Sequence, residues 1–262
     1  MKGSGYRSSG TDSALFNMFF SGKSDIGKRR ATNQDSFSIV TLPGEFCLLT
    51  VCDGMGGANG GNVASELACS VYTGTVKNGF DPGMTDRAAL LKKAVAAANT
   101  AVYEKAASDE SLRGMGTTLV SALVAPDGSI TAINVGDSRM YCIDGGELRQ
   151  ITRDHSYVQY LVDMGQLTIS EAENASIKNI IIRSVGNEEE SNPDLFTLRL
   201  SEGSYILLCS DGLTNCVPKA DIAAAVSAET QKELDDCAGQ LISLANEGGG
   251  IDNITIILGK IV

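Results

Sequence analysis

The chain contains a single histidine, His155, and no tryptophan. One imidazole is too few for a metal site or a hydrolase centre that requires several histidines. In the segment TRDHSY we therefore expect His155 to be a hydrogen-bonded structural residue rather than a proton-transfer group. Nucleotide-binding signatures are lacking as well. No G-x-x-x-x-G-K-[ST] segment occurs, and in DGMGGANG Asn59 stands where a dinucleotide fingerprint requires its last glycine.

Disulfide, zinc and membrane signals are also absent. The seven cysteines form no C-x-x-C pair and lie mostly in apolar runs, which is typical of buried thiols in a reducing compartment. None is followed by arginine six residues later, so the pattern of thiolate phosphatases is missing. No apolar run is long enough to span a bilayer, and the N-terminal run ALFNMFF lacks a signal-peptide cleavage site. We expect a cytoplasmic protein with no membrane partner.

Positive charge is scarce, because 32 acidic residues against 21 basic ones give a net charge of −11. This balance argues against a nucleic-acid or anionic-membrane partner that is bound through general electrostatics. Hydrophobic residues make up 43% of the chain, which rules out wholesale disorder. Since no composition break divides the 262 residues, we expect a flexible tail over residues 1–13 and a single domain over residues 14–262.

Turn signals such as LPGE, APDGS, IDGGE and SEGS separate a series of apolar runs, with the spacing of antiparallel hairpins. The expected strands lie at about Ala14–Ser21, Ser36–Thr41, Phe46–Cys52, Thr117–Ala125, Ser129–Val135, Arg139–Ile143, Leu195–Leu200, Ser204–Cys209 and Ile254–Leu258. Apolar residues at helical spacing predict helices over residues 63–71 and 90–102, with two more near Lys219–Val226 and Glu229–Ala245. Hairpins combined with helices in separate pairs predict an α+β fold. The polar stretch Tyr157–Gly186 is expected to be a mobile insertion.

Two expected strands each deliver an aspartate into a glycine turn. Asp53 ends the run FCLLTVCDGMGG, and Asp211 ends SYILLCSDGL. A carboxylate in an apolar setting is costly unless it is paired, hydrogen-bonded or bound to a metal. Six aspartates draw attention, five of them beside a strand end or a glycine: Asp25, Asp35, Asp53, Asp137, Asp211 and Asp252. Oxygen ligands without histidine or thiolate favour Mg²⁺ or Mn²⁺ over zinc.

Convergence of Asp53, Asp211 and Asp252 would place three negative charges in a small volume, which two divalent cations would neutralise. Two such cations can hold a water molecule, lower its pKa and direct it in line at a phosphorus atom. A guanidinium group suits the remaining phosphate oxygens, and Arg30 is the candidate. From the residues alone, Arg30 can equally be an exposed surface charge.

In this order, the motifs resemble those of the metal-dependent protein phosphatases of type 2C in their bacterial form. They run from Ser24 to about Leu258 and read SDIGKRRATNQDS, VCDGMGG, GMGTTL, NVGDSRMY, ITRDHSYV, IIRSVG, LLCSDGL and DNITII. The resemblance implies a four-layer αββα sandwich of two antiparallel sheets flanked by antiparallel helix pairs, with a flap near residues 157–186. It also implies a serine/threonine phosphoprotein phosphatase that uses two Mn²⁺ or Mg²⁺ ions and forms no phosphoenzyme.

The resemblance assigns roles to individual residues. The implied metal ligands are Asp53, the Gly54 carbonyl, Asp137, Asp211 and Asp252. Among them, Asp53 should bridge both metals, and Asp137 with Asp211 should hold a third, weaker one. Arg30 should bind the phosphate, and Asp35 should orient the metal-bound water.

The sequence departs from the family pattern at two places. Met55 stands where many eukaryotic members have a histidine proposed as general acid, so the leaving group must take its proton from water or another acid. In SEAENASIKN, Ala175 and Ser176 replace a frequent His-Pro pair, so the flap's conformation and the substrate preference that it helps to set do not carry over.

By family context, the partners would be phosphoserine and phosphothreonine proteins, including a cognate bacterial Ser/Thr kinase and its substrates. Two alternatives remain. One is a phosphatase of a phosphorylated anti-sigma antagonist, which normally carries appended sensory domains. The other is a catalytically silent binding module on the same fold. Silent members generally lose the metal aspartates, whereas Asp53, Asp211 and Asp252 are all present, which favours an enzyme.

Overall fold

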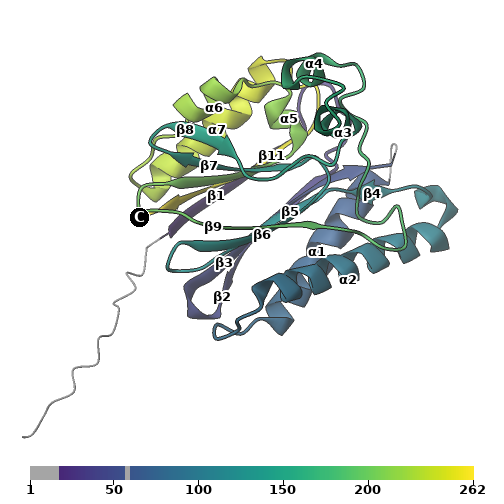
Figure 1. Cartoon of the computed structure of the whole chain (residues 1–262), viewed down its shortest axis with the longest axis horizontal. Coiled ribbons are helices and arrows are strands. Elements are labelled where there is room, and N and C mark those ends of the chain that lie inside the picture. Colours follow the sequence, from purple (N-terminus) through teal and green to yellow (C-terminus); the bar gives the residue numbers. More distant parts are fainter. Residues whose placement is uncertain (1–17, 57–59) are drawn as a thin grey trace, which may run out of the picture.

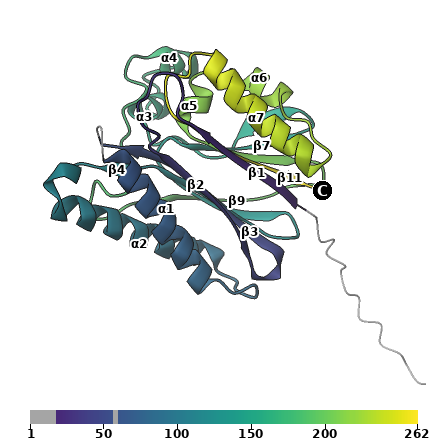
Figure 2. The ribbon, with the colours of Figure 1, turned by 180° about the vertical axis from the view of Figure 1, so that it is seen from behind.

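Two antiparallel sheets lie face to face between two layers of helices (Figures 1 and 2). The computed structural model describes residues 18–56 and 60–262. The five-stranded sheet comprises, in spatial order, β1 (Met18–Asp25), β11 (Ile254–Ile261), β10 (Tyr205–Cys209), β7 (Arg139–Asp144) and β8 (Glu147–Gln150). The six-stranded sheet comprises β2 (Asp35–Leu42), β3 (Phe46–Met55), β5 (Leu119–Val124), β6 (Ser129–Val135) and β9 (Asp194–Arg199), with the short β4 (Gly116–Thr117) paired to β3.

Helices cover both outer faces. The six-stranded sheet is covered by α1 (Gly61–Gly79) and α2 (Arg87–Ser108), and the five-stranded sheet by α6 (Lys219–Ala224) and α7 (Gln231–Glu247) (Figure 1). The remaining helical segments are α3 (Tyr157–Asp163), α4 (Ile169–Asn174), α5 (Asp211–Thr214) and the 3₁₀ turns η1 (Pro43–Glu45) and η2 (Glu110–Leu112). The α+β class and the αββα layering are therefore confirmed. None of the helices in the described part of the chain combines the length and apolar character needed to cross a bilayer.

The burial pattern of β3 explains its continuous apolar sequence. Leu48 and Cys52 face the core beneath α1 and α2, whereas Leu49 and Val51 face the core between the two sheets. A strand that is buried on both faces has no polar side, so the period-two alternation of a half-exposed strand is missing. The first polar side chain after this run, Asp53, comes where the strand reaches the end of the sheet.

The expected strands are present, with differences at three places. The stretch Thr117–Ala125 forms β4 and β5 rather than one strand, because Thr118 leaves the ladder and donates its N–H to the carbonyl of Asp53 at 2.9 Å. The short β8 was not expected, since ELRQ is polar and half exposed. The first strand continues to Asp25 rather than ending at Ser21, because its polar end pairs with β11 up to Asp25.

Some expectations fall on parts of the chain outside the described residues. These are the tail over residues 1–13, the start of the first expected strand over residues 14–17, and Asn59. Within the described residues, the expected insertion 157–186 contains α3 and α4, which lie beside α5 at one end of the sandwich (Figure 1). That it moves stays a prediction.

Candidate metal centre

A cavity of about 660 Å³ opens at the end of the sandwich where β3 ends and where β11 begins. It is lined by Arg30, Ala31, Thr32, Gln34, Asp53, Gly54, Met55, Gly56, Asp137, Asn179, Ile181, Asp211 and Asp252. Six of the seven site residues expected from the sequence are in this lining, and they come from five separate parts of the chain. The seventh, Asp35, lies opposite Asp53 on the neighbouring strand β2.

The main chain of Asp53 is held from the adjacent turn. Its N–H donates to the Thr118 hydroxyl at 2.9 Å, and its carbonyl accepts the N–H of Thr118 at 2.9 Å. The Thr117 hydroxyl donates to the same carbonyl at 2.9 Å. The backbone is thereby fixed, and the Asp53 side chain remains at the cavity.

Asp35 stands behind Asp53 and is tied to the strand that leads to Asp211. Its Oδ2 accepts the hydroxyl proton of Ser210 at 2.7 Å. Burial raises the pKa of the Asp35 carboxyl to about 7. Two carboxylates directly opposite each other on neighbouring strands repel, and such a pair destabilises a sheet unless protons or cations compensate it.

The other three aspartates reach the cavity from the start of a helix and from two loops. Asp211 begins α5, and its Oδ2 accepts the Asn215 amide at 2.9 Å. Asp252 precedes β11, and its Oδ2 accepts the guanidinium of Arg30 at 2.7 Å. Asp137 lies between β6 and β7 and is 6% exposed.

The cavity concentrates negative charge. Burial, together with neighbouring carboxylates, raises the pKa of Asp137 to about 8 and that of Asp211 to about 6. Burial and the charge of Asp35 also raise the pKa of Asp53 well above its usual range. Such upward shifts are expected where desolvated carboxyl groups share one site with few cations to balance them.

The residues present fit a hard divalent cation by the chemistry of their donors. The buried Oδ1 atoms of Asp137 and Asp211 have no hydrogen-bond partner among the described residues. A buried oxygen in this condition is costly and suits a cation. Gly54 is in the lining of the same cavity, and a side chain at this position would put Cβ 2.1 Å from the Gly61 carbonyl oxygen.

The carboxylates do not form a complete cage. In residues 18–56 and 60–262, no three Asp, Glu, His or Cys side chains are arranged so as to hold an ion by themselves. Arg30 engages the carboxylate of Asp252, and Ser210 engages that of Asp35. Backbone carbonyls and water would have to complete the ligand shell of any cation bound here.

Asn253 is a site residue that the sequence analysis missed. It is 4% exposed, and its Oδ1 accepts the N–H of Gln34 at 2.8 Å. Its Nδ2 donates to the carbonyls of Ile26 at 2.9 Å and Thr32 at 3.0 Å. The side chain thus holds the loop that carries Arg30 against the start of β11. A polar residue between Asp252 and the apolar run ITII was the available signal.

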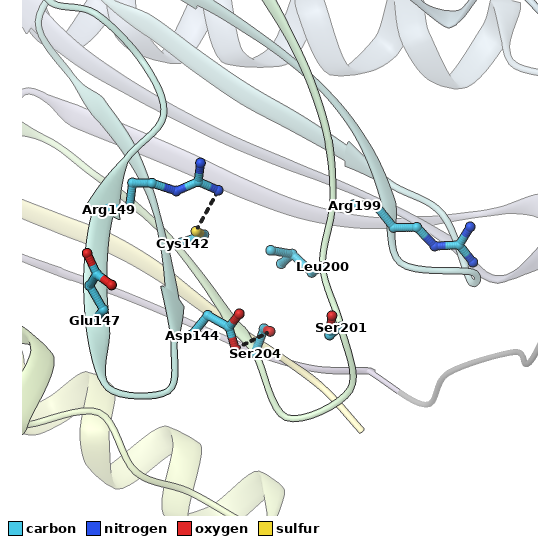
Figure 3. A pocket seen from close by; sticks show the side chains of 8 residues that line it. All are labelled: Cys142, Asp144, Glu147, Arg149, Arg199, Leu200, Ser201 and Ser204. Carbon is cyan, nitrogen blue, oxygen red and sulfur yellow. Dashed lines mark hydrogen bonds between the residues drawn. The ribbon is translucent and has the colours of Figure 1, made fainter.

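A second cavity, of about 220 Å³, lies between the β7–β8 hairpin and the turn that precedes β10 (Figure 3). The Arg149 guanidinium donates to the Cys142 sulfur at 3.6 Å, and the Ser204 hydroxyl donates to Asp144 at 3.3 Å. Acidic and basic side chains both line this cavity, and no expected site residue does. It is therefore not the candidate site.

The chain is similar to proteins of known class over most of its length. The sequence model of the family described as "Protein phosphatase 2C" matches residues 22–243. The chain is 37% identical to the protein phosphatase PhpP of Streptococcus pneumoniae over 235 residues, which are 89% of this chain and 94% of PhpP.

Solved structures share the architecture. The S. agalactiae serine/threonine phosphatase superposes with a TM-score of 0.88 at 37% identity, covering 94% of this chain and 100% of that one. The catalytic domain of the serine/threonine protein phosphatase PstP in complex with two manganese ions superposes with a TM-score of 0.81 at 35% identity. That match covers 95% of this chain and 100% of the PstP chain.

Proposed function

The chain belongs to the protein phosphatase 2C family, and from this membership we propose that it hydrolyses phosphoserine and phosphothreonine esters of proteins. Water attacks phosphorus in line with the departing serine or threonine oxygen, and no phosphoenzyme forms. The bond between phosphorus and that oxygen breaks, and the products are inorganic phosphate and a free hydroxyl group.

The observation that carries this proposal is the gathering of acidic oxygens from distant segments in one cavity, two of them buried without a partner among the described residues. The residues that would hold two Mn²⁺ or Mg²⁺ ions are Asp53, the Gly54 carbonyl, Asp211 and Asp252. Asp137 with Asp211 would hold a third, weaker ion. Bound there, the two ions supply an attacking water of lowered pKa and stabilise the charge that develops on the phosphate. The PstP structure with two manganese ions supports this ion pair.

The chain's own residues have separate tasks in this reaction. Arg30 lies at the cavity and binds the non-reacting phosphate oxygens, because a guanidinium fork matches their geometry. Its bond to Asp252 uses one of the five N–H donors of such a group. Asp35 orients the attacking water from behind Asp53, and its position opposite Asp53 on the neighbouring strand supports this role. Met55 cannot donate a proton, so the leaving oxygen takes its proton from water or from another acid.

We place the enzyme in the cytoplasm, in opposition to a bacterial Ser/Thr kinase whose phosphorylated substrates it would share. The similarity to bacterial serine/threonine phosphatases supports this assignment.

A phosphatase assay on a phosphothreonine peptide tests the proposed function. We expect phosphate release in Mn²⁺ and none in excess chelator, with unphosphorylated peptide as the only other product. A protein that binds the peptide in Mn²⁺ and releases no phosphate would be the silent binding module, and the proposed function would be wrong.

Arg30 offers a test of phosphate binding. Replacing Arg30 with alanine should raise the KM for the phosphopeptide by about tenfold and change kcat much less, since the lost contact serves ground state and transition state alike. The neighbouring Arg29 is exposed, and Arg29→Ala is the matched control for loss of one positive charge. Equal KM changes in the two variants would show that Arg30 acts only as a surface charge and does not bind the phosphate.

A further inference from the structure

His155 lies at a junction that the catalytic proposal does not use. Its side chain is 4% exposed, and its Nδ1 accepts the backbone N–H of Gly136 at 3.1 Å. Gly136 directly precedes Asp137, and its φ of +109° and the 2.6 Å approach that a Cβ would make to Thr118 exclude a larger residue there. The imidazole therefore restrains the peptide that carries the Asp137 side chain.

The other ring nitrogen points to a different part of the chain. Nε2 lies 3.1 Å from Oδ2 of Asp194, the first residue of β9. Because Nδ1 accepts a hydrogen bond from the Gly136 N–H, the ring proton of the neutral imidazole is on Nε2, where it donates to Asp194. Burial lowers the pKa of His155, in agreement with a neutral ring.

The backbone of His155 is joined to the segment that closes the insertion 157–186. The N–H of Ile182 donates to the His155 carbonyl at 2.8 Å, and the N–H of Tyr157 donates to the Ile180 carbonyl at 2.8 Å. Arg183 then donates to Oδ1 of Asp194 at 3.0 Å, so both side chains that flank the imidazole belong to this closing strap, Ile180–Asp194. Ile181, in the same strap, lines the candidate metal centre.

We propose that His155 is a positioning residue that couples the placement of Asp137 to the placement of the closing strap at the rim of the cavity. Nδ1 holds the loop that carries Asp137 in position, and Nε2 holds the closing strap in position at the rim of the cavity. The intact ring thus joins the two segments, and loss of either bond releases the segment on that side. The inference rests on the proposed function only in taking Asp137 as a ligand of the weakest cation.

Two substitutions separate the bond of the imidazole to Gly136 from its contact with Asp194. In His155→Asn, the amide oxygen reaches the position of Nδ1 and retains the Gly136 bond, while the contact with Asp194 is lost. In His155→Gln, the longer amide reaches the position of Nε2 and retains the Asp194 contact, while Gly136 loses its acceptor. A residue with a purely structural role would be damaged similarly by both changes.

The first readout is direct binding of Mn²⁺ to the metal-free protein, followed by titration calorimetry. For the weakest Mn²⁺ site we expect the dissociation constant to rise about tenfold in His155→Gln, since loss of a group that orients a ligand typically costs 10–100-fold in affinity. In His155→Asn we expect it to stay within about twofold of the wild type. Equal shifts in the two variants, or none in His155→Gln, would overturn the proposal.

The second readout is amide hydrogen exchange in the closing strap. Exchange at Ile182 and Arg183 should be faster in His155→Asn than in His155→Gln, with a higher KM for the phosphopeptide. Asp194→Asn is the matched control outside the core, because Asp194 is 39% exposed and its change leaves the Gly136 bond intact. Asp194→Asn should speed exchange in the closing strap and leave Mn²⁺ affinity unchanged. Unchanged exchange in this variant would contradict the proposed role of the His155–Asp194 contact in holding the strap.

Mn²⁺ affinity and hydrogen exchange are both measured without turnover, and only the KM comparison requires an active enzyme. A wild-type protein that fails to release phosphate would contradict the proposed function, whereas the difference between the two His155 variants in Mn²⁺ binding would still decide the coupling.

Discussion

Asp53→Asn should abolish Mn²⁺-dependent hydrolysis of p-nitrophenyl phosphate, with a loss of at least about a hundredfold in kcat. Asp53 lies near the end of a strand that is buried on both faces, and its main chain is fixed by Thr117 and Thr118. An amide of the same size preserves this backbone but removes the one negative charge that both cations would share. The loss should therefore come from metal binding rather than from unfolding, and a melting curve checks this.

Asp25→Asn is the matched control for this variant. Asp25 also ends a strand and was one of the six aspartates singled out in the sequence, but it is absent from the cavity lining. Its Oδ1 accepts the N–H of Gly27 at 2.8 Å, a bond that an asparagine oxygen can also make. We expect activity within about twofold of the wild type, since the exchange removes a charge outside the cavity and keeps the turn. Wild-type turnover in Asp53→Asn would reject the metal assignment.

The metal-free protein should lose stability as the pH rises from 6 to 8. The pKa values of Asp35, Asp137 and Asp211 are raised by burial to about 7, 8 and 6. In the unfolded chain the same groups titrate near pH 4. Between pH 4 and 8 the folded state thus holds protons that the unfolded state has released, and the free energy of unfolding falls with rising pH. In excess chelator, the melting temperature at pH 8 should be at least about 5 °C below that at pH 6.

In Mn²⁺, the melting temperature should rise between pH 6 and 8 instead of falling. Cations that bind the carboxylates of the folded state stabilise that state by mass action, and they bind more tightly when the carboxylates are ionised. Asp137→Asn removes the group with the highest of the three pKa values and should flatten the pH dependence in chelator. A melting temperature that is independent of pH between 6 and 8 in chelator, or unaffected by Mn²⁺, would contradict the charge cluster.

Much of the fold could be predicted because its signals are local. The apolar run ending at Asp53 identifies a strand with two buried faces, and turn residues mark the hairpins. The errors fall where a contact between distant segments decides the local structure. Thr118 leaves its strand because it is bonded to Asp53, and the polar end of β1 stays extended because β11 pairs with it up to Asp25.

The candidate site divides in the same way. Glycine turns and strand ends marked Asp53, Asp211 and Asp252 as members of one site, and the resemblance to a family added a metal-binding role for Asp137. No pattern along the chain predicted that Arg30 pairs with Asp252, that Asn253 holds the loop of Arg30, or that His155 joins two loops.

By itself, then, the sequence determined which residues end the strands and supply acidic oxygens, because strand burial and turn chemistry depend on neighbours a few positions away. Only the tertiary structure decided which donor faces which oxygen and which buried oxygens remain without a hydrogen bond. Those pairings join residues more than 200 positions apart, such as Arg30 and Asp252, and depend on how two sheets pack.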